Sequence, residues 1–431
     1  MTESISARHL ELAEQQATQL ATEMSANAAE ITSVAVVGGG TMGRGIAITL
    51  LDAGLAVTLL EVDSDGVDMA RESLTAYYQS RVSRGPLSDD DAQARLSALH
   101  FTTTYAHLAE ADLVIEAVFE DLDIKREVFK QLDAACKSST ILASNTSYQD
   151  INLLAEVTER PRNVIGMHFF SPANVMKLLE IVQGEATSPS TLTTVIALAQ
   201  RCGKISVVSG VCYGFIGNRI NRRLQQQAQL CLLEGATPLE IDQAMEQFGM
   251  AMGPLAVGDL AGLDIGYRAR KALSAAQRGD PRTYRIPDQL VEDGRLGQKS
   301  GLGYYRYESG TRSRQEDPKV IQLIASASEE FGYTRRTLTA DEIVERLLLA
   351  VVNEAASVLS EGIARRASDI DLVYVYGYGF PKSEGGIMFW ANRLGLDLVH
   401  AKLLKYWQLS GDTQLEPVKL VLDLASSGRR F

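Results

Sequence analysis

The sequence is poor in the residue types that build metal sites and disulfide frameworks. Its 431 residues include four cysteines and five histidines, and the cysteines form no C-x-x-C pair and no Cys/His cluster. This spacing predicts neither a zinc site nor a set of disulfides, so we expect no bound metal and a reducing compartment. No stretch of about 18 apolar residues is free of charge, which argues against a membrane span.

The two ends of the chain carry no recognisable address. MTESISARHLELAEQQATQL lacks a basic segment followed by an apolar one, so it does not resemble a secretory signal. SSGRRF, at the other end, matches no retention or peroxisomal motif. We therefore expect a cytoplasmic protein that does not bind membranes.

Positive charge is also scarce. The chain has 42 Lys and Arg against 54 Asp and Glu, a formal net charge of −12. A general nucleic-acid-binding protein would carry a basic footprint, so we expect no nucleic-acid partner. Hydrophobic residues make up 45% and charged residues 22%, the mix of a soluble globular protein, and the length predicts two or three domains.

Strands alternate with helices from Ser33 to about residue 210. The apolar runs typical of buried strands are SVAVVG from Ser33, AVTLLEV (56–62), LVIEAV (113–118), TILAS (140–144), VIGMHF (164–169) and KLLEIV (177–182). This alternation predicts an α/β domain over 31–210, with a Rossmann-like, doubly wound and mostly parallel sheet. Residues 1–30 have a helical composition, and we expect an N-terminal helix or linker there.

The second half of the sequence is predicted to be helical and duplicated. Long helices are expected at 214–235 and 341–362, and no strands after about residue 210. LLEGATPLEIDQAMEQFGMAMGP is echoed by LSEGIARRASDIDLVYVYGYGFP further along the chain. Such self-similarity indicates two copies of an all-α domain, at 211–310 and 311–431. The Gly-rich stretch 297–314 is the expected linker between them.

A glycine fingerprint lies where the first strand meets the first helix. GGGTMG, residues 38–43, fits G-x-G-x-x-G. Gly38 allows the tight turn, Gly40 lets the backbone approach a pyrophosphate, and Gly43 lets the helix pack on the strand. Glu61 follows 18 residues after Gly43, at the end of the second strand. An acid there binds ribose hydroxyls and repels a 2′-phosphate, so the pattern predicts NAD rather than NADP.

One histidine has the context of a general base. His168 lies at the end of a predicted strand, in GMHFFSP, and Glu180 follows 12 residues later at the end of KLLEIV. If these strands pair, the carboxylate reaches the imidazole, fixes its tautomer and stabilises its charged form. A buried structural histidine explains the same spacing equally well, so spacing alone leaves both interpretations open.

Two polar segments accompany this pair. SNTS (144–147) follows a predicted strand, at the edge where open α/β sheets bind ligands. GFIGNR (214–219) opens the helical half. Ser/Asn clusters are usually turns or caps, so neither segment would indicate a site alone.

At these residues the chain resembles the 3-hydroxyacyl-CoA dehydrogenase family. The matching segments are VVGGGTMGRGIA, VIEAVFEDLDIKREVF, ASNTS, IGMHFFSPANVMKLLEIV, GFIGNRI, MGPLAVGDLAGLD and GQKSGLGYY, which cover about residues 31–310. The duplicated helical half resembles the dehydrogenase portion of multifunctional β-oxidation enzymes, particularly the peroxisomal type. The resemblance implies reversible, NAD-dependent oxidation of (S)-3-hydroxyacyl-CoA to 3-oxoacyl-CoA.

The family's site residues fall on matching positions of this sequence. Its catalytic pair falls on His168 and Glu180, and its substrate-contacting serine and asparagine fall on Ser147 and Asn218. The implied cofactor contacts are Gly38, Gly40, Thr41, Met42, Gly43, Glu61, Glu120, Lys125, Ser147, Ser171 and Lys299. Tyr376 of the second copy matches a substrate-contacting tyrosine of the multifunctional enzymes.

The sequence departs from the family pattern in three places. Ser171 follows HFF where many members have Asn, which puts one cofactor hydrogen bond in doubt. Glu61 stands where many have Asp, and should do the same work. Residues 1–30 are too short for the hydratase/isomerase domain of the multifunctional enzymes. We therefore expect no hydration or isomerisation, from either a stand-alone dehydrogenase or a fragment.

Two other functions stay open. One is a dehydrogenase for small free β-hydroxyacids, which often uses a lysine of the helical half. The other is a catalytically silent NAD-binding relative, against which the four matching site residues argue. Arg219, Arg222 and Arg223 would suit CoA phosphates, although a solvated basic helix face is the simpler interpretation. Single-copy members pair through their helical domains, and the second copy here could fill that surface, so we expect a monomer.

Overall fold

The computed structural model describes residues 5–25, 28–271, 273–308 and 313–431. The chain divides into two compact units, which are described separately. Unit 1 comprises Met1–Asn218 and Val358–Tyr378, and unit 2 comprises Arg219–Ser357 and Gly379–Phe431. A short piece of the second helical copy therefore belongs to the unit that contains the sheet.

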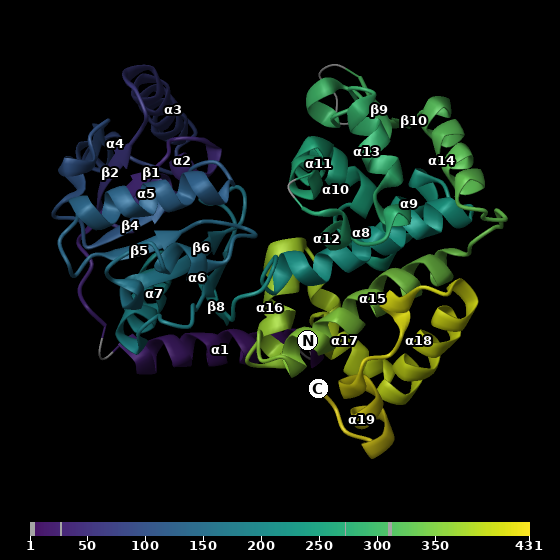
Figure 1. The fold of residues 1–431 in the computed structure, drawn as a ribbon. Helices are drawn as coiled ribbons and strands as arrows, with labels where there is room; N and C mark the ends of the chain where they lie inside the picture. The colour runs from purple at the N-terminus through teal and green to yellow at the C-terminus, as the bar shows by residue number, and fades with distance from the viewer. Residues whose placement is uncertain (1–4, 26–27, 272, 309–312) are drawn as a thin grey trace. The chain divides into compact units, whose positions relative to one another are not determined.

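Within the described residues, unit 1 is built on one eight-stranded sheet (Figure 1). Its strands are β1 (Ser33–Val37), β2 (Ala56–Leu60), β3 (Leu99–Thr102), β4 (Leu113–Glu116), β5 (Ile141–Ser144), β6 (Val164–Phe169), β7 (Leu178–Val182) and β8 (Ile205–Ser209). Their spatial order is β3-β2-β1-β4-β5-β6-β7-β8. Neighbours run parallel except β6 and β7, which are antiparallel. The predicted Rossmann-like, mostly parallel sheet is confirmed.

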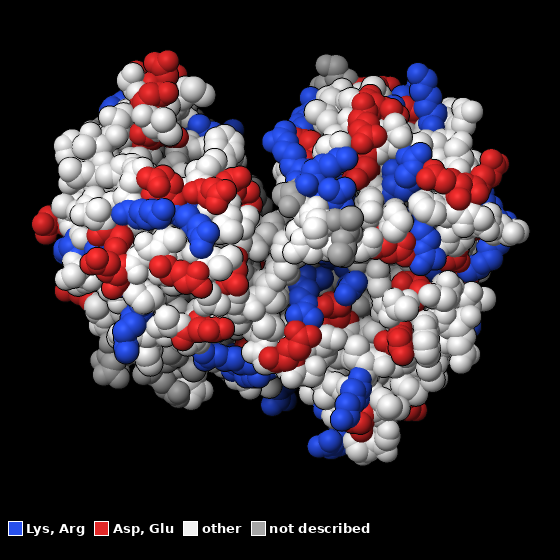
Figure 2. Space-filling model, in the orientation of Figure 1, with Lys and Arg blue, Asp and Glu red and all other residues white. Residues whose placement is uncertain are grey.

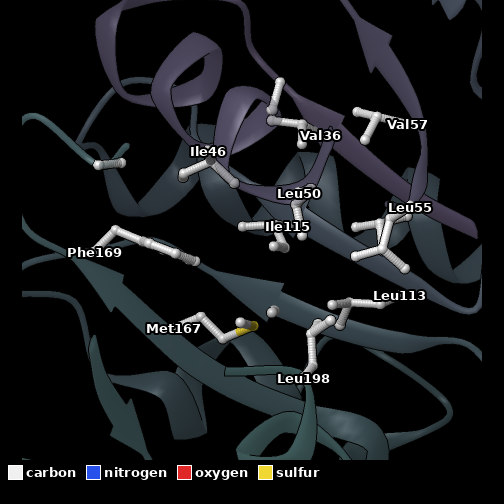
Figure 3. Close-up of a cluster of buried hydrophobic side chains, with 14 of the residues drawn as sticks. Val36, Ile46, Leu50, Leu55, Val57, Leu113, Ile115, Met167, Phe169 and Leu198 are labelled. Atoms are coloured by element: carbon white, nitrogen blue, oxygen red, sulfur yellow. The ribbon is translucent and has the colours of Figure 1, made fainter. Parts of the chain in front are cut away.

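Helices cover both faces of this sheet, so most of its strand residues are buried and apolar. They are α2 (Thr41–Asp52), α3 (Ser64–Ser83), α4 (Asp89–Ser97), α5 (Leu122–Ala135), α6 (Ile151–Ala155) and α7 (Pro189–Arg201). Successive side chains of β1 enter different cores: Val36 packs with Ile46 of α2, whereas Val37 packs with Phe129 of α5. Figure 3 shows the first of these cores, with Val36, Ile46 and Leu50 among its residues.

Two helices distant in sequence cover the β7–β8 end of the sheet. The N-terminal helix α1 (Ile5–Ser25) packs along α7 and β8, and also contacts α16 (Ala367–Tyr378). The helix α16 packs on β7 and β8. A 2.9 Å contact joins His9 Nε2 to Asp371 Oδ2, and Gly210 N donates to Ile363 O at 2.8 Å. These contacts attach part of the second helical copy to the sheet.

Unit 2 is largely helical. Its helices are α8 (Gly217–Glu234), α9 (Pro238–Phe248), α10 (Pro254–Ala261), α11 (Leu263–Lys271), α12 (Ala275–Arg278), α13 (Arg285–Glu292), α14 (Pro318–Glu330), α15 (Ala340–Ser360), α17 (Ile387–Leu394), α18 (Leu396–Ser410) and α19 (Lys419–Ser427). Of α8 only the part from Arg219 onward belongs to unit 2, and of α15 only the part up to Ser357. The buried Arg346 of α15 makes two 2.7 Å bonds to Glu234 of α8. Arg219 and Arg223 of α8 both bind Glu354 of α15, so the long helices of the two copies run antiparallel.

The structure corrects the strand assignment in two ways. β3 and β8 are absent from the predicted strands: β3 is a short edge strand with the exposed His100, and β8 is bounded by polar residues. Strands also continue beyond residue 210, because β9 (Tyr305–Tyr307), inside the stretch predicted as a linker, pairs with β10 (Arg314–Glu316), which begins at the last residue of that stretch. Asp259 binds the backbone N–H groups of Tyr304 and Tyr305, which holds this segment against α10.

Figure 2 shows acidic and basic side chains interspersed over the visible face of each unit. Among the residues that the structure describes, every helix is too short or too polar to cross a bilayer.

Candidate active site

The two residues predicted as a dyad lie opposite each other on neighbouring strands. The antiparallel register of β6 and β7 pairs His168 with Glu180. His168 Nδ1 and Glu180 Oε2 are 2.8 Å apart, and the two residues are 5% and 0% exposed. Since a carboxylate only accepts hydrogen bonds, the proton of a neutral imidazole lies on Nδ1. Nε2 is then the free base.

The same carboxylate also holds the start of α8. Its Oε1 accepts hydrogen bonds from Ile216 N at 3.2 Å and Gly217 N at 3.0 Å. The preceding turn has positive φ at Gly214 (81°) and Phe215 (49°), which is uncommon for a phenylalanine. This turn directs the two N–H groups at Glu180, so the carboxylate ties the imidazole to the segment that carries Asn218.

The SNTS segment places a serine on the free side of the imidazole. Ser147 Oγ lies 3.2 Å from His168 Nε2. The loop that carries Ser147 is held by Glu120, whose Oε1 accepts hydrogen bonds from Ser147 N and Tyr148 N at 3.1 Å each. Asn145 Oδ1 accepts from Phe169 N at 2.9 Å, which fastens the loop to β6. The Ser147 hydroxyl and the unprotonated nitrogen of His168 thus lie within reach of the same substrate atom.

A buried ionic network lies behind this loop. Lys125 Nζ is 2.8 Å from Glu116 Oε1 and 3.3 Å from Glu120 Oε2. Ser144 Oγ donates to the other oxygen of Glu116 at 2.6 Å. The Lys125 and Glu116 side chains are 1% and 0% exposed, whereas Glu120 is 37% exposed. The buried ammonium therefore anchors Glu120, and through it the Ser147 loop.

Asn218, the last of the predicted polar site residues, is held by Tyr378, which the sequence did not single out. Asn218 Nδ2 points at Ser147 O, at 3.5 Å, and Tyr378 Oη donates to Asn218 Oδ1 at 2.8 Å. Burial, and then the nearby Glu180 carboxylate, raise the pKa of Tyr378 well above its usual value. Tyr376, the predicted substrate contact, instead donates to Glu14 of α1.

Glu116 and Tyr378 had different sequence signals. Glu116 is an acid inside the predicted strand LVIEAV, and an ionisable residue in a buried strand is a candidate for a special role. Tyr378 had no such signal. It lies two residues after Tyr376, and side chains at that spacing point to different faces of a helix.

The glycine fingerprint has the geometry that a dinucleotide needs. Gly38 has φ +98°, and a Cβ at Gly43 would lie 1.7 Å from Gly38 O. A Cβ at Gly40 would meet nothing within 4 Å, so the backbone there is open to a ligand. No side chain caps the first turn of α2 at Gly40, which leaves N–H groups for a phosphate. These residues fit a bound NAD.

Glu61 lies next to this turn. Its Oε1 accepts from Gly39 N at 2.5 Å and its Oε2 accepts from Val62 N at 3.0 Å. A carboxylate retains further lone pairs after these two bonds, so it can also accept from ribose hydroxyls.

The other predicted cofactor contacts are more scattered. Thr41 and Ser171 are exposed, and Met42 is partly buried against the core. Lys299 belongs to unit 2, where it pairs with Asp264.

The three arginines proposed for CoA phosphates have protein partners. Arg219 Nε and Arg223 Nε lie 2.6 Å and 2.7 Å from the two oxygens of Glu354. Arg222 donates to Arg278 O at 3.3 Å. Arg219 and Arg223 are therefore ion-paired between α8 and α15, a role that neither sequence interpretation included.

The chain matches two family models. The model for the NAD binding domain of 3-hydroxyacyl-CoA dehydrogenase matches residues 33–212. The model for the C-terminal domain of the same family matches twice, at 214–307 and 343–430, which confirms the duplication.

Curated relatives are longer than this chain. The peroxisomal bifunctional enzyme of Cavia porcellus is 42% identical over 417 residues, which are 94% of this chain and 57% of that protein. The fatty acid oxidation complex subunit alpha of Psychrobacter cryohalolentis is 35% identical, over 97% of this chain and 58% of its own length. This chain thus spans little more than half of such relatives.

Among solved structures, 3-hydroxybutyryl-CoA dehydrogenase from Escherichia coli K12 superposes with a TM-score of 0.81. That match is 27% identical and covers 93% of this chain and 99% of the other. The dehydrogenase part of multifunctional enzyme 1 from C. elegans has a TM-score of 0.65 at 27% identity, and covers 94% of this chain and 96% of the other.

Proposed function

Because the chain belongs to the 3-hydroxyacyl-CoA dehydrogenase family, we propose that it oxidises (S)-3-hydroxyacyl-CoA to 3-oxoacyl-CoA with NAD, reversibly, in fatty acid β-oxidation. The observation that carries the proposal is the 2.8 Å contact between His168 Nδ1 and Glu180, with Ser147 Oγ 3.2 Å from the free Nε2. A secondary alcohol needs such a base to lose its proton.

His168 is the general base in this proposal. The 3-hydroxyl proton passes to Nε2, while C3 loses its hydrogen with the bonding electron pair and becomes a carbonyl carbon. Glu180 stabilises the imidazolium that forms, because its carboxylate is already bonded to Nδ1. In the reverse direction the protonated His168 returns the proton to the 3-keto oxygen.

Ser147 and Asn218 position the substrate. Ser147 Oγ lies beside the nitrogen that takes the proton, so it can bind the same substrate oxygen. Asn218 offers an amide N–H group close to the Ser147 backbone. Holding the reacting atoms in line lowers the entropic part of the barrier.

NAD supplies the hydride acceptor when it is bound. The loop from Gly38 to Gly43 and the first turn of α2 would hold its pyrophosphate, and Glu61 its adenosine ribose. Glu61 would repel a 2′-phosphate, so NADP should be a poor substitute.

The first test is the formation of NADH from (S)-3-hydroxyacyl-CoA of short, medium and long chain, followed by absorbance. NADP in place of NAD and free 3-hydroxybutyrate in place of its CoA ester are the controls. Turnover of the CoA esters with NAD supports the proposal and maps the chain length. Turnover of the free acid alone would select a β-hydroxyacid dehydrogenase, and NAD binding without any turnover would select a silent relative.

The compartment is a separate proposal. We place the protein in the cytoplasm, although relatives such as that of Cavia porcellus are named peroxisomal. Fractionation of cells that express the natural gene, with activity measured in each fraction, tests this. Activity that sediments with organelles would contradict it.

A further inference from the structure

Tyr378 is a residue of the second helical copy that lies next to the site of His168 and Glu180. It is the last residue of α16, and its Oη lies 2.8 Å from Asn218 Oδ1. Its ring meets Phe170 edge-on, with centroids 5.6 Å apart, and Phe170 lies against the imidazole of His168 at 4.7 Å. All of these residues belong to unit 1, so the arrangement is internal to it.

Two glycines make room for this contact. A Cβ at Gly217 would lie 2.7 Å from Cε2 and 2.9 Å from Oη of Tyr378. A Cβ at Gly377 would lie 2.8 Å from Leu178 Cδ2 and 2.9 Å from Phe170 Cε1. A larger side chain at either place would push α16 away from β7 or from the start of α8. The close approach of Tyr378 to Asn218 is therefore built into both segments.

The partners of Asn218 determine which way its amide faces. An asparagine amide donates from Nδ2 and accepts at Oδ1. On one side lies Ser147 O, a carbonyl that only accepts, so Nδ2 must face it. On the other side lies the Tyr378 hydroxyl, which can donate to Oδ1. The carbonyl decides which way the amide faces, and the phenol stabilises that orientation by donating to Oδ1.

We propose that Tyr378 is a positioning residue that orients the Asn218 amide, so that Nδ2 is presented as a donor to an oxygen of the acyl-CoA substrate. This inference rests on the proposed function. The contact to Ser147 O is long, at 3.5 Å, and Nδ2 has two hydrogens, so a substrate oxygen can be bound there. Without the phenol, Oδ1 loses its donor and only the long contact to Ser147 O holds the amide, so Nδ2 is presented to the substrate less firmly.

The phenol remains a donor at all working pH values. Burial raises the pKa of Tyr378 well above its usual value, and the Glu180 carboxylate adds to this. The orientation of Asn218 should therefore be independent of pH.

The test compares Tyr378→Phe, Asn218→Ala and the double variant. A neutral hydrogen bond contributes about 0.5–1.5 kcal/mol, so Tyr378→Phe should lower kcat/KM for a 3-hydroxyacyl-CoA roughly two- to thirteenfold. The KM for NAD should not change. In the Asn218→Ala background the same change should have no further effect, because the phenol acts through Asn218. Equal multiplicative losses in both backgrounds would overturn the proposal.

Tyr406→Phe is the matched control. It removes a hydroxyl that donates to a carboxylate, Glu345, at 2.7 Å within unit 2. Its activity should equal that of the unaltered chain, and thermal unfolding of all variants shows that each is folded.

A binding measurement keeps the two proposals distinguishable. Calorimetry with acetoacetyl-CoA, a 3-oxoacyl-CoA, in the presence of NAD requires no turnover. Weaker binding to Tyr378→Phe, with no such difference in the Asn218→Ala background, supports the role of Tyr378. Equal binding would overturn it, even if the unaltered chain is active. An inactive unaltered chain would contradict only the proposed function, since the calorimetry still decides the role of Tyr378.

Discussion

At the scale of single residues, Glu180 joins the imidazole of His168 to the start of α8. Its two oxygens accept from one imidazole nitrogen and two backbone N–H groups, and the side chain is fully buried. A neutral amide of the same shape has only one oxygen, so its NH₂ group must face a donor. The carboxylate is therefore needed both for the tautomer of His168 and for the start of α8.

Glu180→Gln should lower kcat by about 10²–10⁴-fold, because the amide no longer stabilises the imidazolium. NAD affinity should be unchanged, since the glycine loop is untouched. Glu185→Gln, at an exposed position just after β7, is the control. The measurements are steady-state kinetics and NAD fluorescence titration; a loss below fivefold, or an equal loss in the control, would contradict the role given to Glu180.

How far the sequence predicts the site differs from residue to residue. His168 and Ser147 follow from strand ends, because the carboxyl edge of a sheet brings such positions together. Glu180 lies in the middle of β7, and its contact with His168 follows only if the two strands pair as neighbours. The contacts of Glu116 with Lys125 and of Tyr378 with Asn218 do not follow. They depend on the direction of side chains and on the docking of α16, which no local pattern in the sequence specifies.

At the scale of elements, the glycine loop and α2 separate two functions of glycine. Gly43 is required by the fold, because a Cβ would meet the carbonyl oxygen of Gly38. Gly40 is open on its outer side and has an extended conformation that any residue adopts (φ −64°, ψ −172°). Gly43 is therefore needed for the packing of α2, whereas Gly40 leaves space for the ligand.

Gly40→Ala should keep the fold but weaken NAD binding about tenfold or more, because a hydrogen bond to a charged phosphate contributes about 1.5–3 kcal/mol. Gly43→Ala should instead lower the melting temperature, since crowding against backbone outweighs the roughly 1 kcal/mol gained in helix propensity. Thermal unfolding and NAD titration of both variants test this. The opposite pattern, with Gly40→Ala destabilised and Gly43→Ala stable, would contradict it.

The helix pair α8–α15 depends on a buried ion pair. Arg346→Ala should reduce the free energy of unfolding by about 3 kcal/mol, the lower end for a broken buried pair, because Arg336 still contacts Glu234. Arg268→Ala, whose side chain is 77% exposed, should change it by less than about 0.5 kcal/mol. Urea unfolding followed by the fluorescence of Trp390 and Trp407, both in unit 2, measures the difference. Equal effects would contradict the account.

At the scale of the whole molecule, the sheet and the duplication were predictable, whereas the boundary between units was not. Alternating strands and helices, and a repeat in the sequence, indicate both features directly. Val358–Tyr378 belongs to the sheet-containing unit because α16 contacts α1, β7 and β8. Those contacts join residues more than a hundred positions apart, which is why no local pattern in the sequence indicates them. The domain boundaries derived from the sequence stay a prediction.

The duplication leads to a prediction about assembly. We expect a monomer of 46.9 kDa, because α15 of the second copy already covers α8 of the first through the Glu354 and Glu234 ion pairs. Light scattering of the purified protein at several concentrations tests this. A stable dimer would contradict it, and would direct attention to the exposed Leu260 and Ile265 of α10 and α11.

The most direct test of the central claim is His168→Ala, measured with (S)-3-hydroxybutyryl-CoA and NAD. We expect kcat to fall by about 10²–10⁴-fold, the usual contribution of a general base, while NAD binds as before and the protein stays folded. Turnover close to that of the unaltered chain would show that another group takes the proton, and would contradict the mechanism.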